Sequence, residues 1–306
     1  MQSDGIRIGT LGSQLALVQA EATRQALVAA LAIPADAIST VAIRTTGDKI
    51  TDRPIAEAGG KGLFTKEIDE ALIDGRIDIG VHSAKDMATR LPPGIVIAAS
   101  LPRQDVRDAF VSPIAKTLTD LPRGARLGTS SLRRRALALR LRPDLQTVDL
   151  RGNVDTRLRK IADGEADATL LAAAGLARLG LSDRAASFID VATWLPAAGQ
   201  GVVAITAREE DVAMRQRLAA IDHRPSSIAL AAERAFLAVL DGSCRTPIGG
   251  YAEVNGERVA FHGITVKLDG SEAHEVAREG AVGDAEAIGR DAAADLARRG
   301  GSGFFR

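Results

Sequence analysis

Cys244 has the most distinctive chemistry in this chain, because it is the only cysteine among 306 residues. It lies in a stretch, 241–250, whose glycines and Pro247 predict a tight loop. Arg245 beside it would favour the thiolate, the form that attacks electrophiles. The alternative is a small buried apolar residue, which is what most free cysteines are. The loop alone therefore leaves a covalent attachment site and a structural cysteine both open.

A run of hydroxyl and basic side chains in the middle of the chain is the second candidate. Thr129, Ser130 and Ser131 follow a short predicted strand and are predicted to cap the next helix, where free backbone N–H groups could bind an anion. Arg133 and Arg134 fall in the first turn of that helix, where a cation opposes the helix dipole. We interpret this costly placement as a sign of an anionic ligand.

Arginine also follows the next two predicted strands. Repetition at equivalent points of a parallel sheet predicts a crevice lined with cations, which would bind several carboxylates or phosphates bidentately. A solvated basic helix face is the alternative for an individual arginine. The predicted crevice residues are Arg133, Arg134, Arg151, Arg157 and Arg178.

Two polar sites are predicted in the first third of the chain. Lys85 and Asp86 follow the carboxyl end of a buried strand predicted at 77–81, where ligands bind in a parallel sheet; an ordinary surface ion pair is the alternative. His82 is predicted to be a hydrogen-bonded structural histidine, and no metal site is expected, because no second histidine lies at metal-ligand spacing. Lys61 lies in a glycine-rich stretch that lacks the spacing of a phosphate loop, so a mobile lid and a surface loop both stay open.

Alternating strand and helix patterns predict two α/β lobes that carry these residues. The first strand–helix–strand unit, whose helix Ser13 is predicted to cap, predicts a parallel pair, and a strand at 202–206 is expected to return to the first sheet. After a linker at 223–225, a helix and consecutive strands predict a small α+β domain. The expected domains are residues 1–100 with 201–221, residues 101–200, and residues 222–306.

Composition narrows the choice of partners. The net charge is zero and aromatic residues make up 3% of the chain, which argues against nucleic acid. The longest apolar run, 170–177, is too short to span a bilayer, and a lone cysteine without an apparent signal peptide indicates the cytoplasm. Taken together, the residues predict an enzyme that handles a small polycarboxylate through a covalent link to Cys244.

Seven segments, in this order, resemble the porphobilinogen deaminase family, also called hydroxymethylbilane synthases. They run through nearly the whole chain and are highly specific as a set. They are Gly-Gly-Lys-Gly-Leu-Phe at 59–64, Val-His-Ser-Ala-Lys-Asp-Met at 81–87, Gly-Thr-Ser-Ser-Leu-Arg-Arg at 128–134, Leu-Arg-Gly-Asn-Val at 150–154, Ala-Gly-Leu-Ala-Arg-Leu at 174–179, Gly-Gln-Gly at 199–201, and the loop that contains Cys244.

The resemblance implies a transferase that joins four porphobilinogen molecules into the linear tetrapyrrole hydroxymethylbilane and releases ammonia at each step. It implies a dipyrromethane cofactor held by a thioether to Cys244, a catalytic aspartate at Asp86, and a mobile lid that carries Lys61. Each pyrrole bears an acetate and a propionate, which accounts for the arginines. The implied cofactor and substrate contacts are Ser13, Lys85, Thr129, Ser130, Ser131, Arg133, Arg134, Arg151, Arg157, Arg178 and Gln200.

The resemblance also implies a fold and an assembly. The expected fold has two lobes like those of bacterial solute-binding proteins, with mixed, mostly parallel sheets, and a third domain that holds the cofactor; a monomer is expected. The sequence departs from the family at Leu11, where the family usually has arginine, so either a nearby cation compensates or cofactor binding is weaker. A binding or sensor protein for small anions is the alternative function, and it would release no ammonia.

Overall fold

The computed structural model describes residues 5–44, 65–240, 247–301 and 304. Lys61, Cys244 and the segment at 59–64 therefore lie outside the described residues. The chain forms two compact units, residues 1–104 with 202–230 and residues 105–201 with 231–306. It passes from one unit to the other after Gln104, after Gly201 and within a helix after Leu230.

The first unit is built on a five-stranded sheet with the order β2-β1-β3-β10-β4. Apolar side chains from its strands and from α1 form one core, which includes Ile8, Leu27 and Ile79. The elements are β1 (Ile6–Leu11), α1 (Gln14–Leu31), β2 (Ile38–Ile43), α3 (Lys66–Ile73), β3 (Ile79–Ser83), a 3₁₀ turn (Ala84–Asp86), β4 (Ile95–Ser100), β10 (Val203–Arg208) and α7 (Val212–Ala219).

The second unit contains another five-stranded sheet, with the order β7-β6-β8-β5-β9. Phe110, Leu170 and Trp194 lie in its main core. The elements are β5 (Asp108–Val111), β6 (Arg126–Gly128), α4 (Leu132–Leu141), β7 (Gln146–Val148), α5 (Val154–Ala162), β8 (Ala168–Ala172), α6 (Ala173–Arg178) and β9 (Ser187–Phe188).

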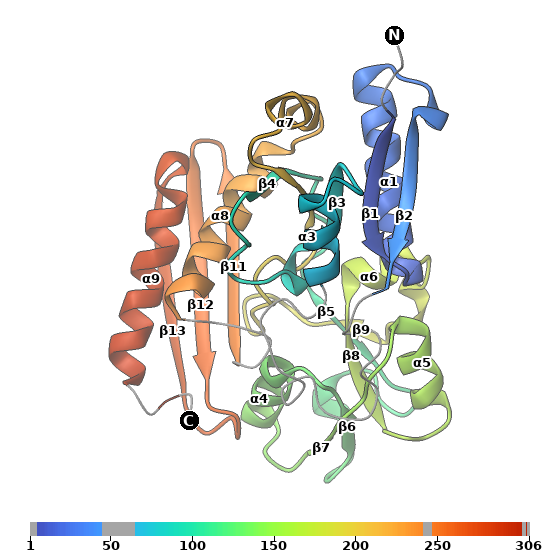
Figure 1. The fold of residues 1–306 in the computed structure, drawn as a ribbon. Helices are drawn as coiled ribbons and strands as arrows, with labels where there is room; N and C mark the ends of the chain where they lie inside the picture. Colours follow the sequence, from blue (N-terminus) through green and yellow to red (C-terminus); the bar gives the residue numbers. More distant parts are fainter. Residues whose placement is uncertain (1–4, 45–64, 241–246, 302–303, 305–306) are drawn as a thin grey trace. The chain divides into compact units, whose positions relative to one another are not determined.

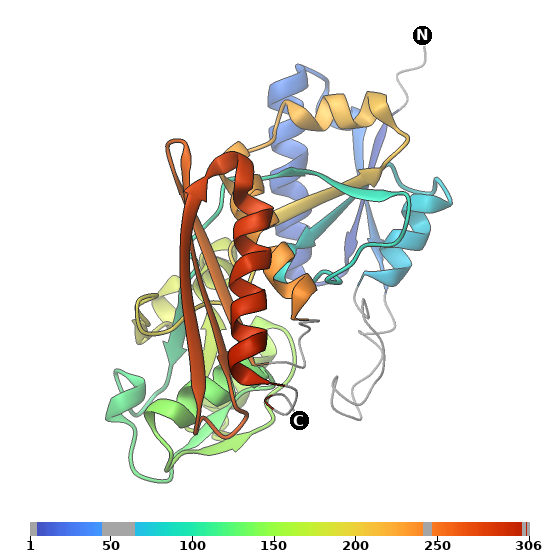
Figure 2. The same ribbon diagram turned by 90° about the vertical axis from the view of Figure 1, so that its left-hand side faces the viewer.

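A three-stranded antiparallel sheet completes the second unit. It consists of β11 (Ile248–Asn255), β12 (Arg258–Val266) and β13 (Ala273–Ala281). Helix α9 (Ala285–Gly300) runs along this sheet, as Figures 1 and 2 show. Helix α8 (Arg224–Val239) leads into the stretch that contains Cys244. Ile264 and Val266 of β12 pack in the same core as Leu137 of α4, so this sheet supports the helix that carries Arg133 and Arg134.

The two five-stranded sheets have the same plan. In each, two parallel pairings (β2-β1-β3 and β7-β6-β8) are followed by two antiparallel ones (β3-β10-β4 and β8-β5-β9). The strand that makes both antiparallel pairings, β10 or β5, is the first strand after the chain passes from one unit to the other.

An arginine–aspartate clasp repeats in both lobes at the start of the strands. Arg7 binds Asp78 through three donors, its backbone N, Nε and Nη2, at 2.7, 3.0 and 2.8 Å. Arg126 binds Asp167 through the same three atoms at 2.7, 3.4 and 3.0 Å. Each clasp joins one strand, β1 or β6, to the residue just before its parallel neighbour, β3 or β8, so the lobes share local contacts as well as strand order.

The α/β lobes, the parallel β1–β2 pair, the return of β10 and the C-terminal strands and helix confirm the sequence analysis. The sheets are mixed as predicted, although among the described strands their parallel pairings do not outnumber the antiparallel ones. The linker expected at 223–225 is wrong, because α8 begins at Arg224 and proline is tolerated in a first helical turn. Strand β5 was not predicted.

Candidate functional site

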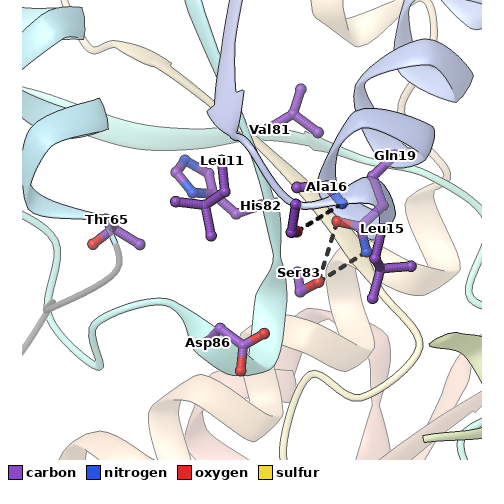
Figure 3. Close-up of a pocket in the computed structure, with 10 residues that line it drawn as sticks. Leu11, Leu15, Ala16, Gln19, Thr65, Val81, His82, Ser83 and Asp86 are labelled. Atoms are coloured by element: carbon purple, nitrogen blue, oxygen red, sulfur yellow. Dashed lines mark hydrogen bonds between the residues drawn. The ribbon is translucent and has the colours of Figure 1, made fainter. Parts of the chain in front are cut away.

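A small hollow in the first unit brings several predicted residues together. Ser13 and Asp86 both line it, next to Leu11, and its volume is about 90 Å³. Figure 3 shows that its wall comes from the end of β1, the first turn of α1, the end of β3 and the turn that carries Asp86. The carboxyl ends of β1 and β3 thus form one polar edge, where ligands bind in parallel sheets.

Helix capping and hydrogen bonds order this edge. The Ser13 hydroxyl accepts from the Ala16 N–H at 3.3 Å and so caps α1, as predicted. Gln19, on the first turns of α1, donates to the Ser83 hydroxyl at 2.8 Å, and the hydroxyl donates back at 3.2 Å (Figure 3). This pair connects α1 to the end of β3, three residues before Asp86.

His82 is a structural histidine, as predicted. It is buried, and its Nε2 lies 3.1 Å from the Thr206 hydroxyl on β10. Within the described parts of the chain, no group of three His, Cys, Asp or Glu side chains is placed to hold a metal ion.

Asp86 is exposed, and in the described part of the chain its carboxylate has no ion-pair partner. Lys85, its neighbour, is half-buried and makes polar contacts of its own. Leu11 packs against the apolar cluster of Ile68 and Leu72. None of the ten described lining residues is lysine or arginine, so none of them replaces the arginine that the resemblance led us to expect at the position of Leu11.

Of the three hydroxyl residues before α4 that are predicted to cap it, Ser131 does so and the other two order the turn. Ser131 caps the helix by accepting from the Arg134 N–H at 3.4 Å. Thr129 accepts from the Ser131 N–H at 3.2 Å, and Ser130 donates to the Leu150 carbonyl at 3.0 Å. These bonds fix the turn between β6 and α4 beside the strand end that leads to Arg151.

Arg133 and Arg134 lie in a buried cluster centred on Asp108, each with 5% of its surface exposed. Arg133 Nη2 donates to Asp108 Oδ2 at 2.8 Å, and Arg134 Nη2 donates to Oδ1 at 2.7 Å. Their Nη1 atoms donate to the carbonyls of Leu195 and Leu170, both at 2.8 Å. The anion that these arginines contact is therefore an aspartate that the sequence analysis did not single out.

Two further donors complete the aspartate's coordination. Trp194 Nε1 donates to Asp108 Oδ2 at 2.8 Å, and Gln200 Nε2 donates to Oδ1 at 2.9 Å. Burial by itself would raise the pKa of Asp108, but Arg133 and Arg134 hold it well below its usual range. Burial lowers the pKa of Arg133, and Asp108 partly offsets this. The carboxylate thus stays ionised inside the protein.

The remaining predicted cations lie around the same strand ends. Arg151 pairs with Asp149 at 3.1 Å, and Arg157 Nε donates to the Gly152 carbonyl at 2.8 Å. Arg178, at the end of α6, donates to the Gly201 carbonyl at 2.7 Å. Burial lowers the pKa of Arg178 to about 10, so it stays charged at neutral pH.

The residues present fit an anionic group. Two guanidinium groups face one carboxylate, so the buried cluster carries one excess positive charge. The buried Nε–H groups of Arg133 and Arg134 also have no acceptor among the described residues. A buried donor without a partner is costly, and a ligand carboxylate would satisfy it. Fold and cluster together define a class: a two-lobed α/β protein with a cation-rich second lobe.

Family comparisons identify the chain more closely. Residues 6–216 match the model described as porphobilinogen deaminase, dipyromethane cofactor binding domain, and residues 227–298 match porphobilinogen deaminase, C-terminal domain. The chain belongs to the porphobilinogen deaminase family. Curated porphobilinogen deaminases from Nitrobacter hamburgensis and Nitrobacter winogradskyi are 54% and 55% identical to it. These alignments cover 100% and 97% of this chain and 98% and 94% of the relatives.

The solved structures that this chain is similar to are more distant. A periplasmic substrate-binding protein of an ABC transporter from Coxiella burnetii is 18% identical, with a TM-score of 0.43 over 75% of this chain and 96% of its own. A methionine-binding protein is 15% identical, with a TM-score of 0.46 over 72% and 91%. Among the described helices, none is both long and apolar enough to cross a membrane.

Proposed function

We propose that this protein is a hydroxymethylbilane synthase, a transferase that joins four porphobilinogen molecules head to tail and releases ammonia at each step. The observation that carries the proposal is family membership over both domains together with a buried arginine cluster that has excess positive charge. Porphobilinogen bears two carboxylates, so this cluster suits it chemically.

A covalently held dipyrromethane would supply the pyrrole carbon to which the first substrate unit is joined. We assign its thioether to Cys244, the only thiol of the chain. Arg133, Arg134 and the hydroxyl groups before α4 would bind carboxylates of the cofactor and of the incoming porphobilinogen. Further carboxylates of the cofactor or the growing chain are proposed to be bound by Arg151, Arg157, Arg178 and Gln200. In the first lobe, Ser13, Lys85 and Lys61 are assigned to the same ligands.

Asp86 is the proposed catalytic residue. Loss of ammonia leaves positive charge on the incoming pyrrole, and a carboxylate beside the ring nitrogen stabilises that charge. Asp86 suits this role because it is exposed, lines a hollow and has no ion-pair partner in the described part of the chain. The same carboxylate can later accept the ring proton.

Two measurements on one preparation test the proposal. Incubation with porphobilinogen should release ammonia, and the intact mass should exceed the sequence mass by two pyrrole units. Peptide mapping should place this adduct on Cys244, and Cys244→Ser should fold without it. Binding of porphobilinogen without ammonia release would instead indicate a binding protein. The monomeric state, the cytoplasmic location, the three-domain division and the absence of nucleic-acid and membrane partners stay predictions.

A further inference from the structure

The carboxylate of Asp108 is the common point of several proposed ligand-binding side chains. It is fully buried at the first position of β5, immediately after the chain enters the second unit. It receives hydrogen bonds from Arg133 and Arg134 on α4 and from Gln200 on the segment that leaves the unit. Residues 25, 26 and 92 positions away in sequence thus meet on the two oxygen atoms of one carboxylate.

The coordination leaves the carboxylate no freedom to turn. Arg134 and Gln200 donate to one oxygen at 2.7 and 2.9 Å, and Arg133 and Trp194 donate to the other at 2.8 Å. Rotation about the carboxylate would break four bonds at once, two of them to charged groups. Each guanidinium is held a second time, by a backbone carbonyl. The planes of both arginines are therefore fixed by protein groups.

Charge explains why a single aspartate suits this position. Without Asp108, the two buried guanidinium groups would repel each other, and their mutual effect already lowers the pKa of Arg133. With Asp108, one excess positive charge remains, and the Nε–H donors of both arginines lack an acceptor among the described residues. A second internal carboxylate would neutralise the cluster and remove its attraction for an anion.

We infer that Asp108 is a positioning residue, which holds Arg133 and Arg134 in the orientation that binds the ligand's carboxylates. The inference rests on the proposed function. Trp194 helps to hold Asp108 in place, because its indole N–H donates one of the four hydrogen bonds that the carboxylate accepts. It is also the only tryptophan of the chain, so its fluorescence reports on the cluster.

Asp108→Asn is the direct test, because it keeps the shape and removes the charge and one acceptor. In cofactor-free protein, the mass adduct should form at least tenfold more slowly than in wild type. In the loaded fraction, KM for porphobilinogen should rise at least tenfold while kcat stays within about threefold, since one lost Arg–carboxylate contact corresponds to roughly 10- to 100-fold. The outcome that overturns the inference is wild-type loading together with a wild-type KM.

Asp167→Asn is the matched control, since Asp167 is also paired with an arginine but directly precedes the first residue of β8, whereas Asp108 lies opposite its last residue, Ala172. If Asp108 were only structural, the two variants would behave alike when compared at equal loss of Tm. We expect Asp167→Asn to load normally and to keep its KM. An equal rise in KM in both variants would overturn the inference.

A second pair of measurements decides the matter if Asp108→Asn does not fold. Trp194→Phe keeps an aromatic side chain and removes one donor to Asp108. Because it also shrinks a buried core side chain, loading is compared with that of Asp167→Asn at equal loss of Tm. We expect loading to slow by about threefold to tenfold; unchanged loading would contradict the inference. In Cys244→Ser protein, glutarate should change Trp194 fluorescence, and a silent titration would count against a carboxylate site. If wild-type protein carries no adduct and releases no ammonia, the proposed function itself is rejected. If wild type is active and the Asp108 and Trp194 variants match it in loading and KM, only the positioning role is rejected.

Discussion

Replacing Asp86 separates charge from shape in the proposed mechanism. Asp86→Asn keeps nearly the same volume and removes the charge, whereas Asp86→Glu keeps the charge and moves it by one methylene. If the carboxylate stabilises positive charge on the pyrrole, kcat should fall in the order Asp86, then Glu, then Asn. The loss for Asn should be about 3 kcal/mol in the barrier, or roughly 150-fold in rate.

The structure also sets the expected change in stability. Asp86 is exposed on a short 3₁₀ turn, and its carboxylate has no ion-pair partner in the parts of the chain that the structure describes. A substitution at such a position changes the free energy of unfolding by no more than about 0.5 kcal/mol. A large loss of rate should therefore come with nearly unchanged Tm in both variants.

The assay measures kcat, KM and Tm of both variants at equal cofactor loading, with loading read from the intact mass. Equal loading matters because a variant that assembles less cofactor would lose rate without any role for Asp86 in the reaction. The reasoning is refuted if Asp86→Asn matches wild type in kcat at equal loading. It is also refuted if the loss of rate follows a loss of Tm, because Asp86 would then be a structural residue.

Three further predictions follow from the charges of the described residues. Burial raises the pKa of Asp69 to about 6, so between about pH 4 and pH 6 the unfolded chain loses this proton while the folded protein keeps it. The contribution of Asp69 to the free energy of unfolding should therefore fall by up to about 3 kcal/mol over this range. Urea unfolding should show that the free energy of unfolding of Asp69→Asn depends less on pH. Arg134→Leu should slow cofactor assembly and also lower stability by about 3–5 kcal/mol, because it leaves Asp108 with one buried cation fewer; a folded variant of unchanged unfolding free energy would contradict this. Leu11→Arg should lower KM for porphobilinogen by up to about tenfold, because the hollow with Asp86 has no lysine or arginine among its described lining residues; an unchanged KM at full loading would show that this position binds no carboxylate.

Local signals in the sequence were read correctly. Ser13 and Ser131 cap helices as predicted, because a cap depends on a few neighbouring residues. The sequence analysis places a linker at 223–225, but α8 begins at Arg224, since proline is compatible with a first helical turn. Strand β5 was missed because it is short and begins with a charged residue. The burial of Asp108 becomes understandable only when the distant Arg133 and Arg134 are known to meet it.

The same limit applies to the cations of the predicted crevice. Five arginines at strand ends pointed to an anion, but the sequence could not assign partners to them. Two of the five contact Asp108, one contacts Asp149, and Arg157 and Arg178 each donate to a backbone carbonyl. A buried pair of arginines calls for a buried acid, so a search for an aspartate beside an apolar run would have found Asp108 as a candidate.

The two lobes share their strand order and their arginine–aspartate clasps but differ in the residues that are proposed to bind ligands or take part in the reaction. At the start of the strands both lobes have the same clasp, Arg7 with Asp78 and Arg126 with Asp167. At the opposite ends the lobes differ. The residue eight positions after the clasp aspartate is Asp86 in the first lobe and Gly175 in the second. The first lobe therefore offers an exposed carboxylate and the second a cluster of arginines, which matches a reaction that needs one anion for a developing positive charge and several cations for a polycarboxylate chain.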